Sequence, residues 1–216
     1  SPKIGGIVAN NSSGSSYGIT YNSYHTIEST CFILADGTMV DTTSAESRQA
    51  FSKSHASLLS DLRQLREEIL SNDKVRERIQ HKFELKNTCG YGMNSFLDHE
   101  DPIDILAHLM IGSEGTLGFI SEVVFKTVPN DPLKASALIY FPNLKEACKA
   151  IGPLRQCSKV SAAELMDRNA LRTVQEEPGM PEELKKLPDE AVALLIDTSS
   201  DTPEALALQF QEIEQK

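Results

Sequence analysis

The chain has 216 residues, of which 40% are hydrophobic and 24% charged. This balance is typical of a globular protein with a packed core and excludes wholesale disorder. Lysine and arginine total 21 against 31 aspartates and glutamates, a net charge of -10. Such a surface repels nucleic-acid phosphates and anionic membranes, so neither is expected as a partner. No apolar run approaches the roughly 20 residues of a membrane-spanning helix, and none is predicted.

The spacing of the four cysteines and five histidines predicts neither a metal site nor a redox pair. Cys31, Cys89, Cys148 and Cys157 match no zinc knuckle or redox pair. We therefore expect free thiols in a reducing compartment, the cytoplasm. The histidines lack metal-ligand spacing, so no metal site is predicted. Because the chain starts at Ser1 rather than at methionine, we expect its native N-terminus to be missing.

The first half of the chain predicts a β-hairpin followed by helices. Residues 29–34 and 38–42 read as strands joined by a tight turn at Asp36-Gly37. Residues 44–82 predict a helical pair that covers a sheet, with His55 and His81 facing solvent. Its first apolar stripe is Leu58, Leu62, Leu65 and Ile69, and its second carries Val75 and Ile79.

A third helix is predicted to start at Asp101-Pro102, because proline is tolerated in the first turn. Its apolar stripe is Ile103, Leu106, Ala107 and Met110. Gly112 ends it, and residues 119–128 read as a strand. The breaks at Pro129 and Pro132 predict a domain boundary between residues 130 and 131.

Beyond the boundary, strands and helices alternate. Residues 135–141, 161–166 and 191–197 read as strands, and helices are predicted at 144–157, after Asp167, and at 203–214. This order predicts an α+β layer with helices on one face of a sheet.

Two glycine-rich stretches stand out as candidate binding segments. Residues 5–14 read Gly-Gly-Ile-Val-Ala-Asn-Asn-Ser-Ser-Gly, in a region with one lysine and no other charge before His25. Glycines allow close approach of a ligand, and successive backbone amides can form a nest for an anion. Plain turns have the same composition. Residues 112–118 read Gly-Ser-Glu-Gly-Thr-Leu-Gly. Neither stretch fits the nucleoside-triphosphate loop or the dinucleotide fingerprint.

Together, these motifs resemble the flavin-binding module of vanillyl-alcohol-oxidase-type flavoproteins. The resemblance rests on residues 4–14, on Leu-Ala-Asp-Gly-Thr at 34–38 and on residues 112–118, in the same order. Residues 86–91 and Glu-Leu-Met-Asp at 164–167 are similar to the branch of D-lactate and D-2-hydroxyglutarate dehydrogenases.

The resemblance implies an FAD-dependent oxidoreductase that transfers a hydride from a D-2-hydroxy acid to flavin and passes electrons to an unidentified acceptor. Residues 1–130 would be part of the FAD-binding domain, with a helical insertion at about 44–82, and residues 131–216 part of the substrate (cap) domain. The implied cofactor contacts are Gly5, Gly6, Asn10, Asn11, Ser12, Ser13, Gly14, Glu114, Gly115, Gly118 and Ile120.

No motif of the chain identifies a catalytic residue. His25 lies near the first glycine-rich stretch and Lys86 in the segment similar to the hydroxy-acid branch, so both are candidates. The family's first flavin subdomain and its metal ligands have no counterpart here, so we expect an internal fragment that is inactive alone. Two alternatives stay open: a non-catalytic interaction module that self-associates through its truncated face, and an oxidase for an alcohol or sugar.

Overall fold

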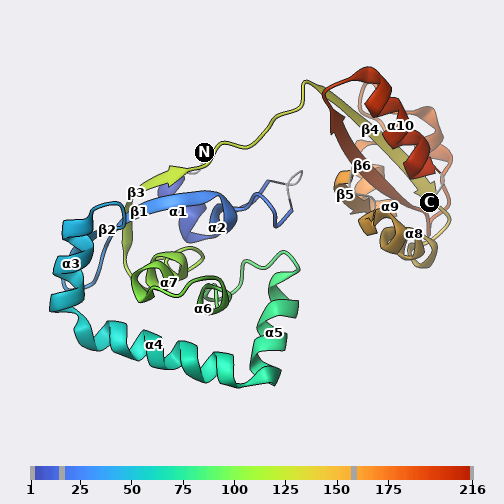
Figure 1. Ribbon diagram of the computed structural model, residues 1–216. Helices are drawn as coiled ribbons and strands as arrows, with labels where there is room; N and C mark the ends of the chain where they lie inside the picture. Colours follow the sequence, from blue (N-terminus) through green and yellow to red (C-terminus); the bar gives the residue numbers. More distant parts are fainter. Residues whose placement is uncertain (1–2, 15–17, 157–159, 215–216) are drawn as a thin grey trace. The chain divides into compact units, whose positions relative to one another are not determined.

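The computed structural model describes residues 3–14, 18–156 and 160–214. The chain forms two compact units, Ser1–Val128 and Pro129–Lys216, and the division falls two residues before the predicted boundary. Each unit contains helices and a three-stranded sheet (Figure 1), so the fold class is α+β as predicted. No helix in the described part of the chain is long and apolar enough to span a membrane.

The sheet of the first unit has the order β2-β1-β3, with all neighbours antiparallel. β1 is Ile27–Ile33, β2 is Met39–Asp41 and β3 is Phe119–Phe125. The predicted hairpin is confirmed, because Gly37 takes a positive φ of 86° in the turn between β1 and β2. Phe32 pairs with Val40 on one side and Ile120 on the other, and its side chain is fully buried.

Helix α7 (Pro102–Leu109) forms the core with this sheet. The Asp101 side chain caps it by accepting a hydrogen bond from the Ile103 amide at 2.7 Å. The predicted apolar stripe of this helix is confirmed, since all four of its residues are buried. The short helix α6 (Ser95–Asp98) precedes α7 and packs against it.

The predicted helical pair is in fact a set of three helices: α3 (Ala45–Ser54), α4 (Ala56–Ser71) and α5 (Asp73–Phe83). The first was missed because Phe51 is its only buried apolar residue, which leaves no periodic pattern. Helix α4 lies along α6 and α7 rather than covering the sheet (Figure 1).

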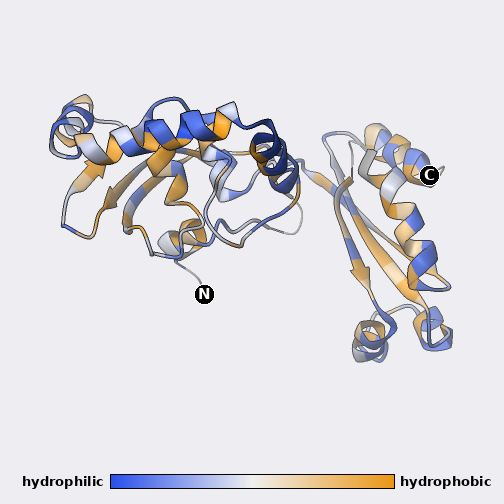
Figure 2. Ribbon diagram, turned by 90° about the horizontal axis from the view of Figure 1, so that it is seen from below, coloured by the Kyte–Doolittle hydropathy of each residue, from blue (hydrophilic) through white to orange (hydrophobic). Residues whose placement is uncertain are grey.

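The predicted apolar stripes of these helices were wrong in part. Leu59 is buried in place of Leu65, which is 40% exposed, and Val75 in α5 is exposed as well. Figure 2 shows α4 as mainly hydrophilic, with a minority of hydrophobic residues. His55 also differs from expectation: its ring stacks on Phe51 and its Nε2 lies 2.9 Å from Asp36 Oδ2.

The second unit has the sheet order β4-β6-β5, again antiparallel. Its strands are β4 (Leu133–Phe141), β5 (Val160–Met166) and β6 (Val192–Ser200), and its helices are α8 (Leu144–Gln156), α9 (Arg168–Val174), the 3-10 helix η1 (Glu182–Lys186) and α10 (Pro203–Glu214). All the predicted elements are present. The expectation that helices cover one face was wrong, because α8 and α10 pack on Leu194 and Ile196 while α9 and η1 pack on Ala193, which points to the opposite face.

Candidate functional site

The two glycine-rich stretches, far apart in sequence, lie side by side in the first unit. The first stretch forms helix α1 (Ile4–Ala9) and the turn after it. The backbone amide of Gly112 donates to Val8 O at 3.2 Å, and that of Glu114 donates to Ala9 O at 2.9 Å. α1 also lies against β3, where Ile120 O is 3.6 Å from the position a Cβ of Gly5 would take. The two segments therefore form one surface.

The expectation of an open backbone nest over residues 5–14 was wrong in its first half. Residues 4–9 are helical, so the amides of Ile7 and Asn10 donate to Lys3 O and Gly6 O, and the Ser12 amide donates to Ile7 O. The helix places the side chain of Val8 in a cluster with Tyr24, Ile27 and Ile111, where it is fully buried. Among described residues, the backbone amides of Ser13, Gly14 and Gly115 have no hydrogen-bond acceptor. These amides lie at the end of the first stretch and in the middle of the second.

Backbone strain is concentrated in these two stretches. Asn11 (φ 47°) and Glu114 (φ 53°) are the two non-glycine residues with positive φ in the described part of the chain. Such conformations cost on the order of 1 kcal/mol each and gather at functional sites. Ser113 follows α7 and directly precedes Glu114. Its Oγ is buried and has no hydrogen-bond partner within residues 3–14, 18–156 and 160–214. Unfavourable features of this kind single out the surface as a candidate site.

Gly118 ends the second stretch in a position that admits no side chain. A Cβ built there would lie 2.6 Å from Ile33 O and 2.9 Å from Met110 Cε. The close approach lets the chain enter β3 directly beside β1. Gly118 therefore shapes the turn. Its role is to allow close packing of the chain rather than to contact a ligand directly.

Helix α2 (Ser23–Thr26) holds the end of the first stretch in place. The Tyr24 amide donates to Asn11 Oδ1 at 3.0 Å, and Ser23 Oγ donates to Ser12 O at 3.0 Å. Asn10 Nδ2 donates to Ser12 Oγ at 3.1 Å. The Asn11 side chain is thus turned inward, whereas Asn10 and Gly14 are exposed.

A polar cluster behind α2 links it to α6 and α7, and no sequence motif predicted it. Tyr24 Oη donates to Asp98 Oδ2 at 2.7 Å, and Asn94 Nδ2 donates to the same oxygen at 3.0 Å. Burial, followed by the bond to Asp98, raises the pKa of the Tyr24 hydroxyl well above its usual range. The ring of His108 stacks on that of His99 with centroids 3.8 Å apart.

Burial lowers the pKa of both these histidines below the usual 6.5, although the carboxylates of Asp98 and Asp104 act in the opposite direction. The His108 side chain is oriented by its Nδ1, which lies 2.8 Å from Asp104 O and, since a carbonyl only accepts, donates to it. Both rings are therefore held neutral at physiological pH. Neither was predicted to belong to the site, because their proximity comes from the packing of α6 against α7.

The segment before α6 reaches the second glycine-rich stretch. Tyr91 Oη is 2.9 Å from Thr116 Oγ1, which itself donates to Ser113 O at 2.6 Å. Gly90 O lies 3.7 Å from the position a Cβ of Gly112 would take. Residues 86–91, singled out from sequence, thus border the candidate surface.

The two catalytic candidates are both exposed. His25 Nδ1 lies 2.7 Å from Ile19 O. The carbonyl cannot donate, so Nδ1 carries the proton and Nε2 is left as a proton acceptor. Lys86 lies between α5 and α6, and the structure gives no contact that joins it to His25.

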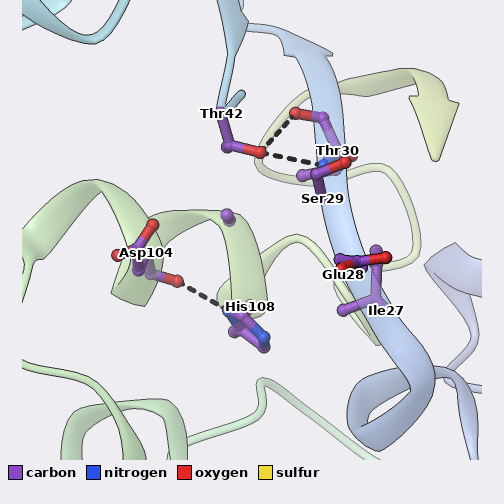
Figure 3. A pocket seen from close by; sticks show the side chains of 8 residues that line it. Ile27, Glu28, Ser29, Thr30, Thr42, Asp104 and His108 are labelled. Atoms are coloured by element: carbon purple, nitrogen blue, oxygen red, sulfur yellow. Dashed lines mark hydrogen bonds between the residues drawn. The ribbon is translucent and has the colours of Figure 1, made fainter. Parts of the chain in front are cut away.

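A small cavity borders His108 of the polar cluster. Its volume is about 30 Å³, and it lies between β1 and α7, lined by Ile27–Thr30, Thr42, Asp104, Ala107 and His108 (Figure 3). This is room for one or two water molecules, so it cannot hold an organic ligand.

No group of three metal-ligating side chains occurs among the described residues. Cys31, Cys89 and Cys148 are free thiols, as predicted, and Cys157 lies outside the described residues.

Comparison with known proteins gives similarity in both sequence and fold. The family of FAD linked oxidases, C-terminal domain, matches residues 131–216. The mitochondrial D-lactate dehydrogenase (cytochrome) of Kluyveromyces lactis is 29% identical over 90 residues, which make up 41% of this chain and 13% of that protein. The structure of an alkyldihydroxyacetonephosphate synthase aligns with a TM-score of 0.57 and 13% identity over 98% of this chain and 31% of that one. The chain spans less than a third of the length of either protein.

Proposed function

We propose, from the match of residues 131–216 to the C-terminal domain of FAD linked oxidases, that the chain is an internal part of an FAD-dependent oxidoreductase acting on a D-2-hydroxy acid. The observation that carries the proposal is the contact between the two glycine-rich stretches through Gly112 and Glu114. It assembles in one place the segments for which the sequence predicted a role in cofactor binding.

The residues of this surface fit a dinucleotide cofactor such as FAD. A diphosphate needs hydrogen-bond donors. In a chain of net charge -10 the amides of Ser13, Gly14 and Gly115, which have no acceptor among the described residues, would supply them without a cationic side chain. FAD, when bound, supplies the acceptor for the hydride from the substrate's α-carbon. The protein's own part is to hold and orient the cofactor and to keep the two stretches together.

The proposed contacts divide into two groups by their proposed role. Gly6, Asn10, Ser13, Gly14, Glu114 and Gly115 are accessible and would touch the cofactor directly. The remaining five act through position: Gly5 lets α1 approach β3, Gly118 admits the turn, Asn11 and Ser12 are held by α2, and Ile120 lies in β3 with its carbonyl toward Gly5. In this role Glu114 would accept hydrogen bonds from hydroxyl groups on the adenosine side.

For the substrate we propose an acid of the D-lactate or D-2-hydroxyglutarate type. The similarity to a D-lactate dehydrogenase supports this choice, as does the place of residues 86–91 beside the second glycine-rich stretch. We retain the cytoplasm as the proposed location, on the free thiols, although the relative from Kluyveromyces lactis is named as mitochondrial.

The experiment is an oxidation assay on the longer enzyme that contains this chain. We expect reduction of an artificial electron acceptor by D-lactate or D-2-hydroxyglutarate, and none by their L-enantiomers. A flavoenzyme that oxidises primary alcohols or sugars but no hydroxy acid would refute the substrate assignment. The 216-residue chain alone is expected to show no turnover, since part of a pocket buries too little of its ligand.

The alternative is a non-catalytic module that acts by self-association. Several large apolar side chains favour it: Met39 is 63% exposed and Phe119 is 67% exposed, and both pair with Ile33 across the sheet. Such a row on an open sheet face is a candidate protein contact. Sedimentation distinguishes the enzyme from the self-associating module. A chain that stays monomeric at all concentrations would argue against the self-associating module.

A further inference from the structure

Helix α5 presents two parallel stripes that the proposed function does not use. Lys74, Arg78 and Lys82 recur at every fourth position, and each is followed by an apolar residue, Val75, Ile79 or Phe83. Together with Met93, these six residues line a groove of about 290 Å³. At 1.5 Å per residue, the cationic stripe extends about 12 Å along the helix.

Within the part of the chain that the structure describes, the three cations of the groove have no ion-pair partner. No carboxylate of the described residues lies within 4 Å of any of them, whereas Arg76 on the same helix pairs with Asp73 at 2.7 Å. This is unexpected in a chain with 31 acidic residues against 21 basic ones. Unpaired like charges along one side of a helix repel each other, so a ligand with complementary negative charge would relieve this repulsion.

The shape of the groove decides which kind of ligand it fits. Its walls come almost entirely from one helix, so a small molecule would keep much of its surface in water. Its floor is recessed at Ile79, which is only 8% exposed, and Val75 is the one exposed apolar residue of its lining. A bilayer contact needs a row of protruding apolar side chains. A polypeptide can follow the whole stripe and fill the floor with its own side chains.

We propose that the α5 groove binds an acidic amphipathic helix of a partner protein. Carboxylates spaced by one turn on that helix pair with Lys74, Arg78 and Lys82, and apolar residues beside them enter the groove over Ile79. The interaction is separate from the surface of the glycine-rich stretches and needs no flavin.

The test is a binding titration of the full chain with a synthetic helical peptide that carries glutamate at every fourth position and leucine beside each. We expect saturable binding that weakens with added salt, and a loss of affinity on the order of tenfold or more in the Lys74→Glu, Arg78→Glu, Lys82→Glu triple variant. The matched control reverses Lys53, Arg63 and Lys126, which are exposed elsewhere on the same unit, and it is expected to bind as the wild type does.

Equal loss in the control variant would overturn the proposal, since net charge alone would then explain binding. So would binding of decanoate or of anionic vesicles through the same three cations in preference to the peptide. Self-association of the chain abolished by the triple variant, without peptide binding, would also overturn it. Circular dichroism of each variant shows whether the helices have been retained.

Discussion

The backbone amide of Glu114 donates to Ala9 O at 2.9 Å, and this bond joins the second glycine-rich stretch to the end of helix α1. Glu114 holds a left-handed φ of 53° at this point, and Asn11, two residues after Ala9, has one of 47°. Both stretches thus bear backbone strain where they meet. The proposed cofactor surface depends on this junction, and the residues that hold it are the ones whose substitution is most informative.

Replacing Gly118 with alanine is expected to lower the free energy of unfolding by about 1–3 kcal/mol, because the new Cβ overlaps a backbone carbonyl that cannot move aside. The overlap is with Ile33 O, at 2.6 Å. Urea denaturation measures the effect. The control is Gly6→Ala in α1, where nothing lies within 4 Å of the new Cβ, and this change should stabilise the chain by about 0.5 kcal/mol. Equal stability of the two variants would contradict the packing described for Gly118.

Asn11 and Asn10 are expected to respond in opposite ways to alanine and glycine. At Asn11 alanine should be less stable than glycine by about 1 kcal/mol, because a Cβ is strained at left-handed φ. Asn10 has a φ of -93°, so there alanine should be the more stable of the two. Thermal unfolding of the four variants checks this. The same order at both positions would show that Asn11 is not strained.

Stability should fall as the pH drops below the usual histidine pKa of 6.5. His99 and His108 have lowered pKa values in the folded chain, so the unfolded chain takes up protons first. The contribution of the two histidines to the free energy of unfolding is complete above pH 6.5. It is lost as the pH falls from 6.5 through their pKa values in the folded chain. The variant His99→Phe keeps the stack on His108 but removes one titrating group. Its urea midpoint should depend less on pH between 7.5 and 5.5, and an unchanged slope would contradict the account.

If His25 accepts the proton of the substrate and Lys86 attracts its carboxylate, substitutions of the two residues should have different kinetic effects in the longer enzyme. His25→Gln should lower kcat about 100-fold, because the Nε2 proton acceptor is lost. Lys86→Met should raise KM for the acid, because a charge that attracts its carboxylate is removed. His81→Gln is the control, since that side chain is 82% exposed on α5, and it should leave both constants unchanged. Wild-type kinetics in the first two variants would remove both residues from the site.

Much of the fold could be predicted because local signals there agree with the tertiary structure. Two adjacent residues were enough to predict the turn at Asp36-Gly37, and two more, Asp101 and the proline after it, were enough to predict the start of α7. The strands and helices of the second unit likewise follow their hydrophobic pattern. Helix α3 could not be found, since one buried residue, Phe51, makes no periodicity.

The candidate site was predicted as two segments but not as a structure. Their composition marked them as binding stretches, yet residues 4–9 form a helix that buries Val8 against Ile111, a contact made far along the chain. The hydrogen bond between Tyr24 and Asp98 likewise joins residues that are far apart in the sequence. No short-range pattern connects those two residues, so only the packing of α2 against α6 reveals them.

The most direct test of the central claim is an FAD titration of the isotopically labelled chain, followed by the shifts of its backbone amide NMR signals. We predict saturable shifts confined to residues 5–14 and 112–120, with an affinity weaker than micromolar because the pocket is incomplete. Shifts elsewhere, or none at millimolar FAD, would contradict the claim that the two glycine-rich stretches form a cofactor surface. Sub-micromolar binding would contradict the claim that the chain holds only part of it.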